Sequence, residues 1–170
     1  MPLVAFDEIV QLGDGRVLGH SLLELWAPVL DIGETHRTLQ LSPDIAAALR
    51  TKLERRFERW YASTVDLPGT YYLQVVSWLF KENRIARGQF RALGRTIDLS
   101  SVRIPTFLLA ARDDEMVSAN QLLATADRIG TARSQIEITV EPCSHLSLFL
   151  GAKTLHGTWP RIARWLSPDA

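Results

Sequence analysis

The stretch that decides the fold is "IPTFLLAARDDEM" (residues 104–116), together with "IEITVEPCSHLSLF" (residues 136–149) further along the chain. In the first stretch an apolar run of strand length ends in acidic side chains, and in the second the predicted strand "IEITV" leads into the loop that carries His145. The nearly continuous apolar character of the first run is typical of a parallel strand that is covered on both faces. Because a parallel sheet gathers functional side chains at the carboxyl ends of its strands, we expect Asp113, Asp114 and His145 to lie close together.

The segment between these two stretches carries clear helix signals. Ser118 and the glutamine three residues later form a capping-box pattern, and Gly130 supplies a stop, so we predict a helix over residues 119–129. A strand–helix–strand unit of this kind crosses over right-handedly, which makes its two strands neighbours in one sheet. A last helix is predicted near residues 152–166, where Pro160 either kinks the helix or starts its second part.

The N-terminal half carries mainly helix signals. Residues 8–18, "EIVQLGDGRVL", place an Asp-Gly pair between two short apolar arms, which predicts a hairpin or a tight turn, with a plain loop as the alternative. Ser42 and Pro43 predict a helix start, and a second helix follows the break at "DLPG" (residues 66–69). Apolar residues at helical spacing give each helix one packing face: Ile45, Leu49, Leu53, Phe57 and Trp60 on the first, and Leu73, Val76 and Phe80 on the second.

These signals predict an α/β fold with a short parallel sheet flanked by helices. Residues 1–96 form an N-terminal turn and a helical region, and residues 97–170 form the strand–helix–strand–helix part. Two strands alone leave both edges of a parallel sheet unpaired and prone to association. A homo-oligomer that forms through an exposed strand edge is therefore one expectation.

Composition excludes several classes of partner. Lys plus Arg and Asp plus Glu both number 19, so no net field would recruit nucleic acid or an anionic membrane. The N-terminus has acids where a signal peptide needs basic residues, and Glu24 and Asp31 interrupt the richest apolar stretch, so neither secretion nor a membrane span is expected. The single cysteine, Cys143, fits a reducing compartment, and we expect a cytoplasmic protein.

The same composition gives no signal for a metal or a cofactor. The four histidines, His20, His36, His145 and His156, show no metal-ligand spacing, and one cysteine is too few for a zinc site. No glycine-rich phosphate loop is present. We therefore expect no cofactor, and a small-molecule or polymer ester is the better candidate substrate.

The acids after the first strand and the histidine after the second suggest acid–base chemistry. A histidine acts as a general base when a carboxylate holds its other ring nitrogen and stabilises the imidazolium. Asp114 is the first candidate for that carboxylate, with Asp113, Glu115 and Glu141 as alternatives. The competing interpretation is that the acids are loop or capping charges and that His145 is a hydrogen-bonded turn residue.

A nucleophile to complete such a site is missing from the sequence. The stretch containing Ser21, "LGHSLLE", resembles the start of a nucleophile elbow, but Leu23 occupies the position where the sharp turn requires glycine. Cys143 lies too close in sequence to His145 to reach its ring and is expected to be a small buried residue. The chain therefore looks like half an enzyme.

Two long stretches resemble the C-terminal part of the polyhydroxyalkanoate synthase and intracellular polyhydroxybutyrate depolymerase group of α/β-hydrolases. They are "PGTYYLQ…VSANQ" (residues 68–121) and "SHLSLFLGAKTLHGTWPRIARWL" (residues 144–166), and the resemblance covers about residues 66–166. The family's "LF..N.L..G" and "DL..I..P" segments correspond to Leu79, Phe80, Asn83, Ile85, Gly88, Asp98, Leu99, Val102 and Pro105.

By that resemblance the chain is a helical lid followed by the C-terminal half of an α/β-hydrolase fold, with Asp114 as the triad aspartate and His145 as the triad histidine. Ser144 occupies a position where the family usually carries glycine. The resemblance implies chemistry on 3-hydroxyacyl esters by an acyl-enzyme route, by hydrolysis or by synthesis. The family's nucleophile, in a "G.S.G" or "G.C.G" elbow, has no counterpart here.

Three hypotheses follow for the function. In the first, the chain is an excised domain or a truncated gene product that is inactive alone. In the second, it is a non-catalytic binding or assembly module on a hydrolase scaffold, which predicts an exposed apolar strand edge or patch. In the third, a separate chain supplies the nucleophile half and restores esterase activity.

Overall fold

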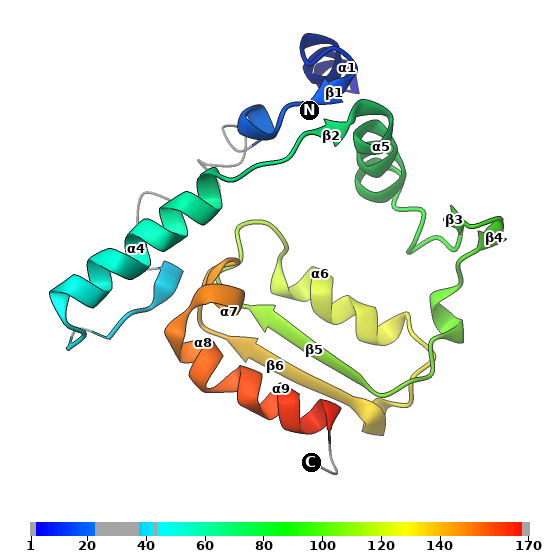
Figure 1. Ribbon diagram of the computed structural model, residues 1–170. Coiled ribbons are helices and arrows are strands. Elements are labelled where there is room, and N and C mark those ends of the chain that lie inside the picture. The colour runs from blue at the N-terminus through cyan, green and yellow to red at the C-terminus, as the bar shows by residue number, and fades with distance from the viewer. Residues whose placement is uncertain (1–2, 23–37, 43, 168–170) are drawn as a thin grey trace. The chain divides into compact units, whose positions relative to one another are not determined.

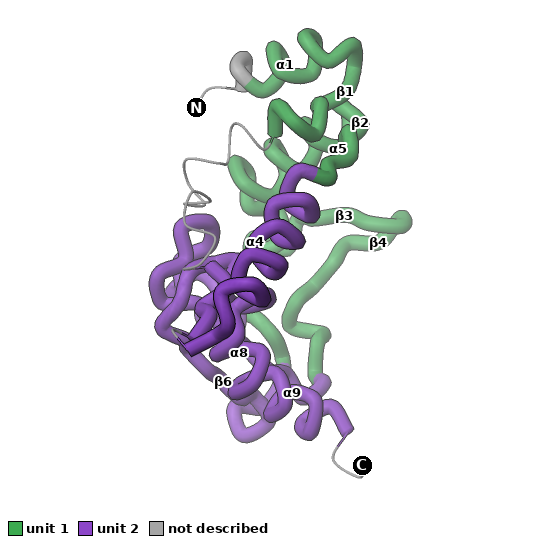
Figure 2. The backbone as a smooth tube through the Cα atoms, turned by 60° about the vertical axis from the view of Figure 1, so that its left-hand side comes forward, with its two compact units in different colours: residues 1–26, 63–103, 128–130 green, residues 27–62, 104–127, 131–170 purple. Residues whose placement is uncertain are grey.

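The computed structural model describes residues 3–22, 38–42 and 44–167, and the chain divides into two compact units (Figures 1 and 2). Unit 1 consists of residues 1–26, 63–103 and 128–130, and unit 2 consists of residues 27–62, 104–127 and 131–170. Among the helices that the structure describes, none has the length and apolar character that a bilayer crossing requires.

A two-stranded parallel sheet lies at the centre of unit 2, as the sequence predicts. Strand β5 (Thr106–Ala111) pairs in parallel with β6 (Ile136–Glu141), and the register runs from Thr106 opposite Ile136 to Ala111 opposite Glu141 (Figure 1). Leu108 and Ala110 on β5 are buried, whereas Ile138 on β6 is 46% exposed. The mixed helix and strand content, with parallel strands flanked by helices, confirms an α/β fold.

The helix between the two strands covers one face of β5. Helix α6 (Ala119–Leu123) packs on β5 and continues as a 3₁₀ segment, η4 (Ala124–Asp127), so the predicted helix is present but changes type partway. Its start confirms the capping prediction, because Ser118 Oγ accepts a hydrogen bond from the Gln121 N–H at 3.3 Å.

The other face of the sheet is covered by the C-terminal helix. Helix α9 (Thr158–Leu166) carries Trp165, whose ring lies edge-on to the Phe107 ring of β5, with 5.7 Å between the ring centroids. Arg161 of the same helix donates a hydrogen bond to Thr139 Oγ1 of β6 at 2.5 Å. Helices α7 (Ser147–Leu150) and α8 (Ala152–His156) precede α9. Pro160 lies in the first turn of α9, so it starts the second part of the predicted terminal helix and does not kink a single one.

Helix α4 (Ala47–Ala62) also belongs to unit 2 and begins later than the sequence predicts. Ser42 Oγ accepts a hydrogen bond from the Asp44 N–H at 3.3 Å, but this closes a local turn and the helix starts five residues further on. Pro43 lies outside the described residues. Of the predicted apolar face, Phe57 is buried, whereas Leu49 and Trp60 are 47% and 54% exposed.

Unit 1 begins with a helix where the sequence suggested a strand arm. Helix α1 (Leu3–Leu12) ends in a tight turn at Asp14 and Gly15, both with positive φ, and the chain then enters β1 (Arg16–Val17). The tight-turn alternative is therefore confirmed and the hairpin is wrong. Strand β1 instead pairs antiparallel with β2 (Leu67–Pro68), which lies about fifty residues further along the chain.

The second helix of unit 1 has an unusual geometry. Helix α5 (Gly69–Gln74) runs directly into a π-helical segment, η2 (Val75–Lys81), in which the Glu82 N–H donates to Ser77 O five residues earlier. Because a π turn holds more residues than an α turn, the predicted apolar face does not continue along it. Val76 is buried as predicted, but Phe80 is 72% exposed, so its assignment to that face is wrong.

The remaining elements of unit 1 are short. Strands β3 (Arg91–Ala92) and β4 (Arg95–Thr96) form a tight hairpin. Its two central residues, Leu93 and Gly94, both have positive φ. A 3₁₀ turn, η3 (Leu99–Ser101), leads toward β5, and η5 (Arg133–Gln135) precedes β6 in unit 2.

Removing the cap of α6 tests the best-supported helix of the chain. We expect Ser118→Ala to lower the free energy of unfolding by about 1 kcal/mol, because the Gln121 N–H loses its side-chain acceptor and keeps only the Ser118 backbone carbonyl. Urea unfolding followed by circular dichroism measures the change. Ser134→Ala is the matched control, since Ser134 is exposed and its hydroxyl makes no hydrogen bond with the described residues. Equal stability of the two variants would contradict the capping role.

Candidate active site

The loops after β5 and β6 are held together by backbone hydrogen bonds beyond the ends of the strands. The Arg112 N–H donates to Glu141 O at 2.8 Å, and the Asp113 N–H donates to Cys143 O at 3.1 Å. The ladder therefore continues past the sheet and brings the acidic loop alongside the histidine loop. This is the juxtaposition that the order of strands in the sequence predicts.

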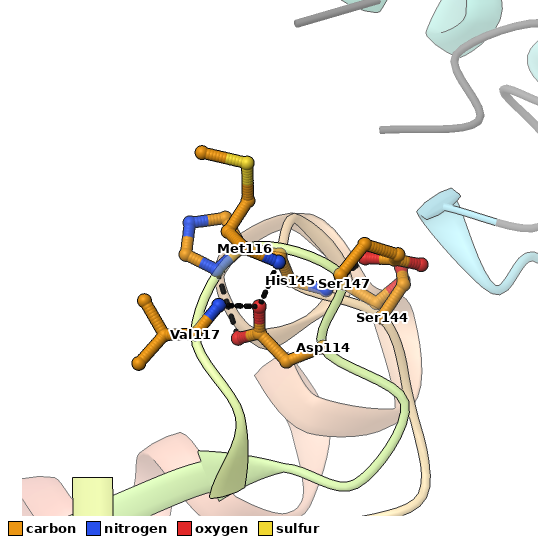
Figure 3. Close-up of polar contacts among 7 residues, drawn as sticks. Asp114, Met116, Val117, Ser144, His145 and Ser147 are labelled. Carbon is orange, nitrogen blue, oxygen red and sulfur yellow. Dashed lines mark hydrogen bonds and ion pairs between the residues drawn. The ribbon is translucent and has the colours of Figure 1, made fainter. Parts of the chain in front are cut away.

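Asp114 and His145 meet at this point (Figure 3). Asp114 Oδ2 lies 2.9 Å from His145 Nδ1, and the two side chains are 6% and 31% exposed. The carboxylate is nearly buried, whereas the ring reaches solvent. In Figure 3 the other ring nitrogen, Nε2, points away from Asp114. A carboxylate on Nδ1 with a free Nε2 is the arrangement that a general-base histidine requires.

The backbone of the same loop fixes the orientation of the Asp114 carboxylate. Asp114 Oδ1 accepts hydrogen bonds from the N–H groups of Met116 at 2.8 Å and Val117 at 2.7 Å, which leaves Oδ2 for His145 (Figure 3). Burial acts to raise the pKa of Asp114. The hydrogen bonds from Val117, His145 and Met116 outweigh burial and hold the pKa below its usual value. Asp114 is therefore an anion at neutral pH.

The alternative acids have other positions. The Asp113 side chain is exposed, and its backbone N–H donates the hydrogen bond to Cys143 O that extends the strand pairing. Glu115 Oε2 accepts a weak hydrogen bond from the His145 backbone N–H at 3.4 Å, and Glu141 accepts one from the Thr158 hydroxyl. Of the four candidate carboxylates, Asp114 is the one in hydrogen-bond contact with the His145 ring.

A serine pair that the sequence analysis did not combine supports the histidine loop. Ser144 Oγ and Ser147 Oγ lie 2.8 Å apart, on either side of His145, and the Ser147 hydroxyl also donates to Thr38 O at 2.9 Å. Ser147 is 1% exposed. The sequence marks Ser144 as a departure from the family's glycine, but it does not show that Ser144 contacts Ser147 or that Ser147 reaches Thr38, 109 positions away.

Of the two candidate nucleophiles, Cys143 lies in the same unit as His145 but makes no hydrogen bond to its ring. Cys143 is 6% exposed and packs with Ala111 and Leu148, as the sequence predicts, and its burial raises the pKa of its thiol. Ser21 belongs to unit 1 and lies in a helical turn after the two-residue strand β1. Within the described residues, the hydrogen bond of the His145 ring goes to Asp114 alone. The described residues also contain no cluster of three or more His, Cys, Asp or Glu side chains suited to a metal ion.

Acid unfolding tests the electrostatics of the site. The folded-state pKa of Asp114 is lowered, so its contribution to stability is complete above the ordinary carboxyl pKa of 3.8 and is lost as pH falls through the lowered value. We expect Asp114→Asn to lower the free energy of unfolding at pH 7 by about 1–2 kcal/mol and to flatten its decline below pH 4. Urea unfolding from pH 7 to pH 2.5 measures both effects. An equal change in the control Asp113→Asn would contradict the assignment.

Comparison with known proteins identifies the family of the chain. The family described as PHB de-polymerase C-terminus matches residues 36–169. The Synechocystis sp. "Poly(3-hydroxyalkanoate) polymerase subunit PhaC" is 27% identical over 114 residues, which cover 66% of this chain and 29% of the relative. The Haloarcula marismortui protein of the same name is 23% identical over 113 residues, which cover 66% and 23%.

The match is therefore to one part of larger proteins. The aligned part of the chain spans less than a third of the length of these curated relatives. No solved structure matches the chain. The family match extends over both loops of the Asp114–His145 pair and over α4. The chain belongs to the PHB de-polymerase C-terminus family, and it represents the C-terminal region of the polyhydroxyalkanoate synthase group.

Proposed function

We propose that the chain supplies the aspartate and the histidine of a Ser/Cys–His–Asp site that acts on 3-hydroxyacyl esters. The observation that carries the proposal is the 2.9 Å contact between Asp114 Oδ2 and His145 Nδ1 at the carboxyl ends of two parallel strands. Family membership adds support, because the same stretch of chain carries both the family match and the pair.

The two side chains would divide the proton chemistry between them. His145 Nε2 would accept the proton of an incoming hydroxyl or thiol nucleophile and later return it to the leaving group. The Nδ1–H would stay on the ring and donate to Asp114, whose negative charge stabilises the imidazolium that forms. The low pKa of Asp114 supports this role, since the carboxylate has to remain ionised while the ring gains a proton.

We also propose that β5, α6 and β6 belong to the C-terminal half of an α/β-hydrolase fold, with residues 1–96 as a lid-like region. It is supported by the order of the parts, in which an acid follows one strand and a histidine follows the next. The sheet has two strands among the described residues, too few for an independent parallel sheet. Further strands from outside these residues would pair with its free edge.

The substrate class is inferred from the relatives. Their printed name is poly(3-hydroxyalkanoate) polymerase subunit, whereas the family is described as a de-polymerase, and both names concern the same ester bond. Acyl transfer to a hydroxyl extends a polyester and acyl transfer to water shortens it, through the same acyl-enzyme chemistry. The pair Asp114–His145 serves either direction. Because the 170-residue sequence holds no nucleophile elbow, we expect the chain alone to be inactive.

A second candidate function is non-catalytic assembly on the same scaffold. It is favoured by the exposure of apolar side chains on one face of β6, where Ile138 and Val140 are 46% and 37% exposed. These residues lie in register with the buried Leu108 and Ala110, so the sheet face is covered over β5 but open over β6. An open apolar sheet face of this kind suits a protein partner or a second copy of the chain.

Complementation tests the catalytic proposal. We would co-express the full chain with the part of the Synechocystis relative that the alignment leaves out, and measure p-nitrophenyl butyrate hydrolysis. We expect no activity from the chain alone and measurable activity from the pair. His145→Ala should lower the activity of the pair by about 10²–10⁴-fold, because the general base is lost. His20→Ala is the matched control and should leave the activity unchanged, since His20 is exposed and its ring makes no hydrogen bond with the described residues.

Two outcomes would contradict the proposal. Hydrolysis by the chain alone that disappears in Ser21→Ala would reveal a nucleophile within it. Activity of the pair that survives His145→Ala would remove the histidine from the chemistry. The assembly function would be favoured by two results together. The co-expressed pair would show no hydrolysis, and analytical ultracentrifugation would show that the chain forms a dimer which Ile138→Lys dissociates.

A further inference from the structure

An open cavity of about 400 Å³ lies within unit 2, between α4, α8 and the segment that precedes α4. Leu53, Phe57 and Trp60 line it from α4, and Leu150 and Leu155 line it from the opposite side. This volume lies in the range of about 300–1,000 Å³ that small-molecule sites occupy. The proposed chemistry of Asp114 and His145 uses none of these side chains.

The walls of this cavity present apolar surface to solvent. Trp60 is 54% exposed and Leu155 is 44% exposed, whereas Phe57, which also lines the cavity, is 5% exposed. The rings of Phe57 and Trp60 lie 5.8 Å apart and form one continuous aromatic wall. An apolar ligand that filled the cavity would remove this surface from water, which favours binding.

Arg56 gives the apolar cavity a positive charge. It lines the cavity and makes no hydrogen bond or ion pair with the described residues. Its helical neighbours three and four positions away are Lys52, Leu53, Arg59 and Trp60, so no carboxylate on α4 is placed to pair with it. Both charged neighbours are basic, which raises the local positive potential.

No other lining residue opposes this charge. His156 also lines the cavity, and its Nδ1 donates a hydrogen bond to Ala152 O at 2.7 Å. Among the described lining residues there is no aspartate or glutamate. Among the residues that the structure describes, the cavity therefore combines apolar walls with one unpaired guanidinium and no carboxylate. The ligand that complements it has an apolar chain and a single anionic head.

We propose that this cavity binds the acyl chain of a medium-length carboxylic acid, with its carboxylate on the Arg56 guanidinium and its chain against Trp60 and Leu155. The proposal does not rest on the catalytic role of Asp114 and His145, because it requires binding alone. Arginine suits the task, since its planar guanidinium donates two parallel hydrogen bonds to one carboxylate.

Isothermal titration calorimetry of the full chain with octanoate tests the proposal. We expect saturable binding at one site per chain. Hexanoate should bind about tenfold more weakly, because two methylenes leave the apolar walls. Octanol should also bind at least tenfold more weakly, since it lacks the carboxylate. These comparisons use the unaltered protein, so they test the cavity even if a variant fails to fold.

Two matched variants test whether the Arg56 guanidinium binds the carboxylate of the ligand. Arg56→Gln should weaken octanoate binding about tenfold and leave octanol binding unchanged. Arg55→Gln, the same change one position away on α4, should have no effect, because Arg55 does not line this cavity and has Glu58 three positions ahead. Circular dichroism would confirm that both variants keep their helices.

Several results would overturn the inference. Absence of saturable octanoate binding would do so, as would equal affinities for octanoate and octanol or equal losses in the two arginine variants. The inference would also be overturned if the unaltered protein bound no octanoate and formed a dimer that Leu155→Glu dissociates. That result would assign the cavity to an interface between two copies of the chain.

Discussion

The parallel pairing of β5 with β6 is the constraint on which the candidate site depends. Its register sets Ala111 opposite Glu141, and the ladder continues through Arg112 and Asp113 into the loop that carries His145. Because the strands end together, the acidic loop and the histidine loop begin together. The 2.9 Å contact between Asp114 and His145 follows from this register, and a slip of one residue would turn the relevant side chains to opposite faces.

The surrounding structure holds that contact from both sides. Backbone N–H groups fix one oxygen of Asp114, and the buried Ser147 hydroxyl ties the histidine loop to Thr38. The His145 ring also lies edge-on to Phe149 at 6.3 Å, and the Phe149 ring lies 6.1 Å from Trp159 of α9. The pair is thus positioned by the fold before any substrate or partner arrives, which is what a preorganised general base needs.

The sequence predicts this part of the fold well, because its signals are local and agree with one another. The apolar run of β5 and the cap at Ser118 lie within a few residues of the feature that each specifies, and the stretch "IEITV" coincides with β6. Asp114 could be ranked first among four acids. Its hydrogen bond to the ring could not be derived, because it depends on loop geometry that residue spacing leaves open. The catalytic role of the pair stays a proposal.

Elsewhere long-range pairing overrides local signals. Strand β1 pairs with β2 about fifty residues away, so the Asp-Gly turn ends a helix and makes no hairpin. The π-helical segment η2 moves Phe80 out of the apolar face that α-helical spacing predicts.

The measurement that tests the central claim most directly is the ¹⁵N NMR spectrum of the His145 ring at neutral pH. The account predicts a proton on Nδ1 and a bare Nε2, with the tautomer reversed in Asp114→Asn, because the asparagine amide can donate to Nδ1. A proton on Nε2 in the unaltered protein, or a spectrum that Asp114→Asn leaves unchanged, would contradict it.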